Sequence, residues 1–319
     1  MTRRRRSHNS EAFWAAQPGL FDVPQAPEGD SELKPLDDSE LTVAEKVRFM
    51  SFGSGSSGNC SYIGTPSCGI LIDAGVDNKY VMEQLAANSI DPLTIKGILL
   101  THDHSDHVRF AYAILRYNHH MRLYATPKAF NGLLRRHSVS RRIKDFHTPI
   151  YKEFPFTLGA FKVTAFETSH DGTDNAGFAI DGEGVHFVVA TDTGIITPRA
   201  DHYIRMATHL MIESNYDAEM LRTGRYPQHL KARIASESGH LDNADTARFL
   251  AEIAQAKTLR KIFLCHLSQD NNTPKIALDT VRAALEGAGI ALAANQFQQD
   301  RLSVEALPRL ESSPLVILS

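Results

Sequence analysis

The sequence is poor in cysteine and has no long hydrophobic run. Its three cysteines, Cys60, Cys68 and Cys265, are too few for a disulfide framework and indicate a reducing compartment. No stretch approaches the roughly 18 consecutive apolar residues that a membrane span needs, so we expect no membrane protein and no membrane partner. Zinc-finger, basic-zipper and aromatic RNA-recognition patterns are also missing, which argues against sequence-specific reading of nucleic acid. Together these absences predict a cytoplasmic protein without disulfides.

The composition is that of an ordinary globular protein. Of the 319 residues, 42% are hydrophobic and 22% are charged, so the chain can bury a sizeable core. This length suits one large domain or two modest ones. The formal net charge is −3, but the charges are unevenly distributed, and no pattern predicts an oligomeric state.

The first 46 residues differ from the rest. The arginines at positions 3–6 are followed by a stretch rich in proline, glycine and acidic residues. A secretory or twin-arginine signal would need an apolar segment of about 7–15 residues after the arginines, whereas polar residues follow here. We therefore expect a disordered leader over residues 1–46 and one folded domain over residues 47–319. In the alternative, the leader's apolar side chains form a short docking segment: Phe13, Trp14, Leu20 and Phe21.

Beyond the leader, short apolar runs alternate with amphipathic stretches. Runs of this kind that are bounded by turn residues predict buried strands, here at residues 47–49, 69–72, 96–100, 161–166, 185–190, 209–212 and 261–264. Helical periodicity occurs at residues 79–88, 108–117, 244–256 and 274–288. Interleaved strands and helices indicate an α/β layered fold. Histidines and carboxylates follow at least five of the predicted strands, which favours one shared site over scattered surface residues.

The segment His102-Asp103-His104-Ser105-Asp106-His107 carries the strongest chemical signal. It places four possible metal ligands within six residues, and imidazole with carboxylate suits zinc, manganese or iron better than calcium or magnesium. His102 and His104 can share one ion, while Asp106 and His107 can turn toward a second. Two ions about 3.5–4 Å apart can clamp the attacking and leaving oxygens of a hydrolysis. The pattern predicts two divalent ions and leaves zinc and manganese open.

At this motif the chain resembles the metallo-β-lactamase superfamily, from residue 47 to about 298. The resemblance implies an αββα sandwich, in which two mixed sheets pack together with helices outside. It also implies ligand roles: His102, His104 and His170 on the first metal, Asp106, His107 and His266 on the second, and Asp192 bridging both. Asp73, after the apolar run 69–72, matches an acidic residue that supports the metal loop from behind.

Further segments resemble the YycJ/WalJ-like exonucleases of that superfamily. They are residues 53–60 (GSGSSGNC), 213–217 (ESNYD), 224–227 (GRYP), 238–244 (SGHLDNA) and 266–272 (HLSQDNN). The resemblance implies a cytoplasmic bacterial enzyme that degrades double-stranded DNA from 5′ to 3′. His240 lies in a segment similar to one in which tRNA-processing enzymes carry a histidine that aids proton transfer to the leaving oxygen.

A strip of positive charge follows the metal motif. Residues 109–144 contain basic side chains and no aspartate or glutamate. Such a concentration is typical of a surface that binds phosphate backbones, with an affinity that falls steeply with salt. Besides Arg122 and Lys128, the strip holds the seven residues that we predict to contact nucleic acid: Arg109, Arg116, Arg135, Arg136, Arg141, Arg142 and Lys144.

These observations predict a metal-dependent phosphodiester hydrolase that acts on nucleic acid. In this hypothesis, a water activated by two metals near Asp192 and Asp106 attacks phosphorus, and His240 protonates the departing oxygen. Three alternatives stay open: an RNA-processing nuclease, a small-molecule hydrolase such as a thioesterase or phosphodiesterase, and a nucleic-acid-binding scaffold with a decayed site.

Overall fold

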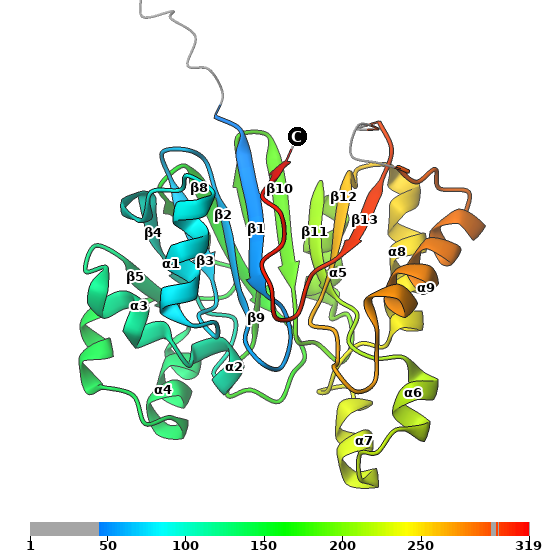
Figure 1. Cartoon of the computed structure of the whole chain (residues 1–319), viewed down its shortest axis with the longest axis horizontal. Helices are drawn as coiled ribbons and strands as arrows, with labels where there is room; N and C mark the ends of the chain where they lie inside the picture. The colour runs from blue at the N-terminus through cyan, green and yellow to red at the C-terminus, as the bar shows by residue number, and fades with distance from the viewer. Residues whose placement is uncertain (1–44, 295–297, 299, 319) are drawn as a thin grey trace, which may run out of the picture. The chain divides into compact units, whose positions relative to one another are not determined.

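Two β-sheets packed face to face form the centre of the molecule (Figure 1). The computed structural model describes residues 45–294, 298 and 300–318. The predicted leader therefore lies outside the described residues, apart from Glu45 and Lys46. Within the described ranges, each sheet has seven strands.

The first sheet is mixed. In spatial order its strands are β14 (Val316–Leu318), β1 (Val47–Gly53), β2 (Cys60–Gly64), β3 (Gly69–Ile72), β4 (Ile95–Leu99), β5 (Arg122–Ala125) and β6 (His147–Pro149). Strand pairs from β14 to β3 are antiparallel, and those from β3 to β6 are parallel. The carboxyl ends of β3 and β4 therefore meet at one edge.

The second sheet repeats this mixed arrangement. Its strands in spatial order are β13 (Ser303–Ala306), β12 (Lys261–Cys265), β11 (His209–Glu213), β10 (Val185–Ala190), β9 (Ala176–Gly182), β8 (Phe161–Glu167) and β7 (Phe156–Leu158). The strands from β10 to β13 are parallel, and those from β7 to β10 are antiparallel. As a result β8, β10, β11 and β12 all end at the same edge.

Helices cover the outer face of each sheet (Figure 1). On the first sheet lie α1 (Asn78–Ala87), α3 (Ala111–Tyr117) and α4 (Pro127–Arg136); on the second lie α5 (Pro198–Met206), α8 (Asn243–Ile253) and α9 (Pro274–Gly287). Three short helices lie near the ends of the strands: α2 (Ser105–Val108), α6 (Ala218–Thr223) and α7 (Gln228–Ile234). This is the predicted αββα sandwich, and the fold prediction is confirmed.

The alternation of side chains along each strand builds the layers. In β1, Phe49 points into the core between the sheets, whereas Met50 points outward to the helices. In β12, Phe263 points inward and Ile262 outward. The rings of Phe49 and Phe263 lie 4.5 Å apart between centroids. Strands buried on both faces read as continuous apolar runs, which is why the sequence reveals β3, β10 and β12.

One predicted helix is wrong in extent. Residues 108–117 do not form a single helix, because α2 ends at Val108 and α3 begins at Ala111. Between them, the backbone N–H of Phe110 donates to the carbonyl of Ala74 at 2.8 Å and so leaves the helical ladder. The backbone N–H of Ala74 in turn donates to the carbonyl of His107 at 2.8 Å, so α2 is tied to the chain just after β3.

Two of the predicted absences, disulfides and membrane-spanning segments, concern residues that the structure describes. Cys60, Cys68 and Cys265 are buried and form no disulfide. None of the helices described is both long and apolar enough to cross a membrane.

Candidate metal centre

Polar side chains gather where the strands of both sheets end. They are Asp73 after β3, His102 after β4, His170 after β8, Asp192 after β10, Glu213 at the end of β11 and His266 after β12. Three of them, Asp73, Asp192 and His266, have left-handed backbones with φ of 59°, 50° and 53°. Non-glycine residues adopt this conformation at a cost and often do so at functional sites.

The glycine- and serine-rich segment 53–60 holds the metal-motif loop in place. The backbone N–H of Asn59 donates to the carbonyl of Asp106 at 2.8 Å, and the Asn59 side-chain amide lies 2.9 Å from His107 Nε2. Ser54 Oγ accepts the backbone N–H of His266 at 2.9 Å. At Gly75 a Cβ would lie 1.5 Å from the Asp106 carbonyl oxygen, so only glycine allows this approach.

The first group of potential ligands consists of His102, His104 and His170. One ring nitrogen of each lies within 4.8 Å of the others, and His104 Nδ1 is 3.3 Å from His170 Nε2. In His170 and His102 the second ring nitrogen, Nδ1, has a polar neighbour. His170 Nδ1 lies 2.9 Å from the Gly239 carbonyl oxygen, and His102 Nδ1 lies 3.0 Å from Thr101 Oγ1. Such contacts fix the orientation of a metal-binding imidazole.

The second group consists of Asp106, His107 and His266, again within 4.8 Å of one another. His107 Nδ1 lies 2.7 Å from Asp73 Oδ2, so its Nε2 faces Asp106 at 3.5 Å. Asp73 also accepts the backbone N–H of Thr101 at 2.9 Å. The contacts of Asp73 are thus with the loop and not with the centre of the cluster.

Asp192 lies between the two groups. Its Oδ2 is 3.3 Å from His107 Nε2, and its Oδ1 is 3.3 Å from His266 Nδ1 and 3.7 Å from His170 Nε2. Burial raises the pKa of this carboxyl, but the charges on His266 and His107 outweigh burial and hold the pKa well below its usual value. The side chain is therefore an anion at the centre of the cluster.

The chemistry of the cluster fits divalent cations. His102 Nε2 and His266 Nε2 are buried and have no hydrogen-bond partner among the described residues, which is costly unless something else binds them. Burial lowers the pKa of His266, but Asp192, Asp106 and Glu213 together raise the pKa to about 10. The buried carboxylates therefore create a negative potential that a cation would balance. The structure brings together all seven residues that the resemblance implied as ligands.

His240 lies beside the cluster, and the sequence reasoning missed its partner, Glu213. His240 Nδ1 is 2.7 Å from Glu213 Oε1, and the His240 ring lies 4.9 Å from that of His170 between centroids. Glu213 is fully buried and also accepts the backbone N–H of Thr193 at 2.8 Å. The sequence feature that could have identified Glu213 is its position at the end of an apolar strand. Asp192 and His266 occupy similar positions.

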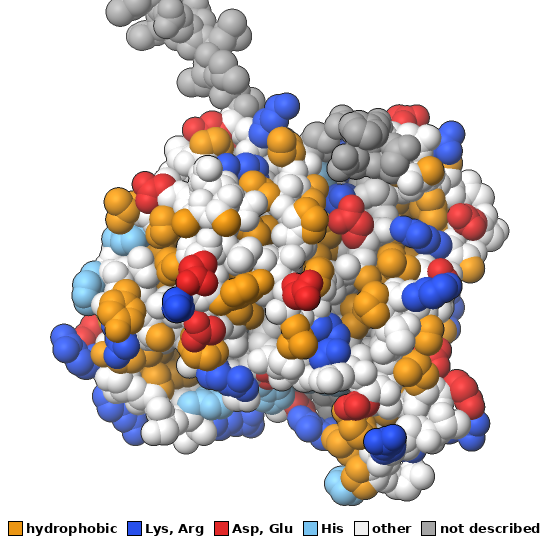
Figure 2. Space-filling view, in the orientation of Figure 1, with side chains coloured by type: hydrophobic (Ala, Val, Ile, Leu, Met, Phe, Trp, Pro, Cys, Tyr) orange, Lys and Arg blue, Asp and Glu red, His pale blue; other side chains and the backbone are white. Residues whose placement is uncertain are grey.

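The basic residues of the strip, 109–144, lie between α2 and α3, on α3, β5 and α4, and on the turn of 3-10 helix after α4. All seven predicted nucleic-acid contacts are exposed. Figure 2 shows Lys and Arg side chains gathered at the lower left, where Figure 1 places α4. Arg136 connects the strip to the metal loop, since its Nε lies 3.5 Å from Asp103 Oδ2.

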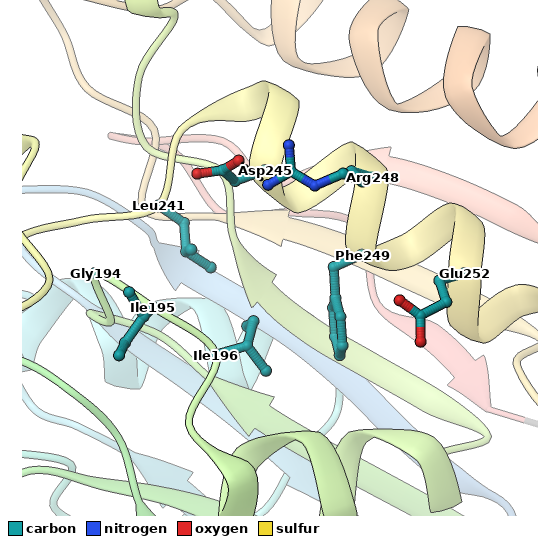
Figure 3. A pocket seen from close by; sticks show the side chains of 8 residues that line it. All are labelled: Gly194, Ile195, Ile196, Leu241, Asp245, Arg248, Phe249 and Glu252. Carbon is teal, nitrogen blue, oxygen red and sulfur yellow. Dashed lines mark hydrogen bonds and ion pairs between the residues drawn. The ribbon is translucent and has the colours of Figure 1, made fainter.

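A pocket of about 280 Å³ that is lined by both apolar and charged residues adjoins the cluster without including it (Figure 3). Its lining residues are Gly194, Ile195, Ile196, Leu241, Asp245, Arg248, Phe249 and Glu252. Leu241 follows His240 in the chain, and Gly194 lies two residues after Asp192. None of the seven potential ligands lines this pocket, so it is a neighbour of the site.

Comparisons with known proteins identify the family of this chain. The family model of the β-lactamase superfamily domain matches residues 69–266. Exodeoxyribonuclease YycJ of Bacillus anthracis is 33% identical over 252 residues, which is 77% of this chain and 92% of the relative. Exodeoxyribonuclease WalJ of Streptococcus pneumoniae is 31% identical over 265 residues, 83% of this chain and 97% of the relative. The chain belongs to the YycJ/WalJ-like branch of the β-lactamase superfamily.

Solved structures show the same fold at low identity. YhfI from Bacillus subtilis, a metallo-β-lactamase fold protein, superposes with a TM-score of 0.61 at 13% identity, covering 84% of this chain and 99% of that one. Zn²⁺-bound PqqB from Methylobacterium extorquens gives 0.59 at 16% identity, covering 83% and 99%. The family and the cluster together make this protein a metal-dependent hydrolase of a nuclease family.

Proposed function

We propose that this protein is an exonuclease that degrades double-stranded DNA from 5′ to 3′ in the cytoplasm. The observation that carries the proposal is the adjacency of a buried His/Asp cluster and an exposed, acid-free basic strip. Both curated relatives are named exodeoxyribonucleases, which supports DNA over other phosphodiesters. The duplex preference and the 5′-to-3′ polarity rest on the family resemblance.

The residues divide into two ligand sets for zinc or manganese. His102, His104 and His170 would hold one ion, Asp106, His107 and His266 would hold the other, and Asp192 would bind between them. When bound, two such ions supply a water of lowered pKa and positive charge beside the phosphate. Asp73 keeps His107 turned toward the centre through the 2.7 Å contact with Nδ1.

His240 is the proton donor to the departing sugar oxygen. Its Nδ1 faces Glu213, so Nε2 is the nitrogen that is left to give a proton. Burial raises the pKa of Glu213, but the charge and hydrogen bond of His240 outweigh it, and the lowered pKa keeps Glu213 ionised. The contact with a buried carboxylate at 2.7 Å fixes the orientation of the ring and leaves Nε2 free to give a proton, as a general acid requires.

The basic strip holds the substrate backbone beside the cluster. The exposed arginines of α4 and of the turn after it, Arg135, Arg141 and Arg142, would contact phosphates without reading bases. With this arrangement we expect a preference for a long polyanion over a small ester.

The test uses demetallated protein that is reloaded separately with manganese or zinc. Substrates are blunt duplex DNA labelled at either the 5′ or the 3′ end, single-stranded DNA and RNA. A 5′-to-3′ exonuclease releases a 5′ label at once in short products, whereas a 3′-labelled strand shortens gradually. Asp192→Ala should be inactive but folded, and Asp181→Asn, a charge loss on an exposed hairpin, should retain activity.

Other outcomes would assign a different function. Cleavage of RNA alone would favour the RNA-processing alternative. Hydrolysis of a phosphodiester or thioester reporter with no nucleic acid cut would favour a small-molecule hydrolase. An active Asp192→Ala variant would contradict the proposed centre.

A further inference from the structure

The hairpin formed by α6 and α7 is attached directly to the metal cluster. It projects at the lower right of Figure 1, and none of the residues of α7 is buried. Its last turn leads into the site, because the carbonyl of Ile234 accepts the backbone N–H of His240 at 2.9 Å. The carbonyl of Gly239 lies 2.9 Å from His170 Nδ1. A shift of this hairpin would therefore reach two histidines of the site.

A second connection runs through an ion pair. Arg233, in α7, donates through Nε to Asp171 Oδ2 at 2.6 Å. The other oxygen of the same carboxylate, Asp171 Oδ1, lies 3.3 Å from His104 Nε2 and 3.6 Å from His170 Nε2. It is buried and has no hydrogen-bond partner within the described part of the chain. Asp171 thus joins the hairpin to two histidines of the first ligand group.

The contact with His104 decides which ring nitrogen can bind a metal. His104 Nδ1 faces His170 Nε2 at 3.3 Å, so for both rings to bind one metal, Nδ1 of His104 would carry the free lone pair and its Nε2 the proton. A carboxylate oxygen 3.3 Å from Nε2 attracts a proton on that nitrogen electrostatically and so favours this tautomer, although the contact is not aligned as a hydrogen bond. Asp171 is placed to provide that oxygen.

A similar Arg–Asp pair, formed by Arg136 and Asp103, does not contact a potential metal ligand. Arg136 of α4 lies 3.5 Å from Asp103, but the Asp103 carboxylate accepts the backbone N–H and the hydroxyl of Thr173 at 2.8 and 2.6 Å. The Asp103 side chain has no recorded contact with an imidazole among the described residues. Of these two Arg–Asp pairs, the one formed by Arg233 contacts ligand side chains.

We propose that Asp171 and Arg233 are positioning residues that couple the α6–α7 hairpin to metal binding by His102, His104 and His170. Arg233 holds Asp171, and Asp171 orients His104. Because coupling between two sites is reciprocal, metal binding steadies the hairpin and a displaced hairpin weakens metal binding. The inference rests on the proposed ligand set and is independent of the DNA substrate.

The first test measures metal affinity by competition with a chelator, with zinc and manganese as probes. Arg233→Gln and Asp171→Asn should each weaken binding about 10-fold, the lower end of the effect of removing a partner of a metal ligand. Arg222→Gln is the matched control, because it removes one positive charge from the same hairpin, where Arg222 pairs only with Glu219 in the described contacts. The control should bind metal as the wild type does.

Two further measurements separate positioning from general damage. The double variant should bind no more weakly than Asp171→Asn alone, because the two residues act in series, and Arg233→Lys should recover part of the loss. Metal should slow hydrogen exchange over residues 228–234 in the wild type and not in Asp171→Asn. Melting curves in the presence of a chelator should agree among all variants.

Two results would overturn the inference. One is an affinity of Arg233→Gln within two-fold of the wild type, or an equal loss in Arg222→Gln. The other is hydrogen exchange of the hairpin that metal does not change. If the metal results hold and DNA is not cut, the proposed function fails while this inference stands.

Discussion

Single residues at the strand ends determine what this site can do. Asp192 and His266 adopt left-handed backbones just beyond the ends of β10 and β12, and both side chains lie in the cluster. The sequence identified these positions through the family pattern and the preceding apolar runs. It could not reveal Glu213 or Asp171 as partners, because each acts on a histidine that only the fold brings near.

A first prediction concerns His240. Replacing it with alanine removes the proposed proton donor, so turnover should fall about 10²–10⁴-fold, the usual range for a general acid. Metal affinity should stay near that of the wild type, since His240 belongs to neither proposed ligand set. Single-turnover kinetics with duplex DNA measures the effect, and His202→Ala, at an exposed position of α5, serves as the control. An unchanged rate would remove His240 from the mechanism.

At the scale of elements, the sequence predicts the buried strands well. It does not predict the bounds of elements that tertiary contacts determine. The runs 69–72 and 185–190 coincide with β3 and β10, because strands covered on both faces are apolar throughout. The run at 47–49 marks only the start of β1, which continues to Gly53. The helix predicted at 108–117 is broken by a hydrogen bond to Ala74, which no local pattern encodes.

A second prediction concerns His209, the first residue of β11. Burial, with the charges of Arg260 and Lys261, lowers the pKa of His209 to about 4. The unfolded chain binds this proton near pH 6.5 and the folded chain only near pH 4, so stability falls as the pH drops through this window. The loss attributable to His209 is about 3 kcal/mol.

Urea unfolding between pH 7 and pH 4 checks this assignment. His209→Asn keeps a polar side chain next to Thr208 but does not titrate, so its stability should decline less on acidification than that of the wild type. The difference between the two curves isolates His209, because the other groups titrate in both proteins. Parallel curves would contradict the assignment.

At the scale of the whole molecule, the fold places the basic strip and the metal cluster on the same side. The loops after the parallel strands assemble the cluster, while α4 and the turn after it carry the basic strip at its flank (Figures 1 and 2). Opposite α4, the α6–α7 hairpin extends beyond the strand ends. The layered fold and all seven potential ligands were predictable from the sequence, whereas the hairpin and its ion pair to Asp171 were not.

A third prediction concerns the basic strip. Arg141→Gln combined with Arg142→Gln should weaken DNA binding and reduce the slope of log affinity against log salt by about 0.9 for each lost phosphate contact. The maximal turnover rate should not change, since both side chains are exposed and remote from the cluster contacts. Lys275→Gln on α9, where the lysine pairs with Asp279 in its own helix, is the control. An unaltered salt slope would exclude these arginines from the interface.

The central claim is that the strand-end cluster binds two divalent ions. Anomalous diffraction from crystals of the protein loaded with manganese or zinc tests it most directly. We predict two peaks per chain, one among His102, His104 and His170 and one among Asp106, His107 and His266, with Asp192 between them. A single peak, or none within the cluster, would contradict the two-metal centre.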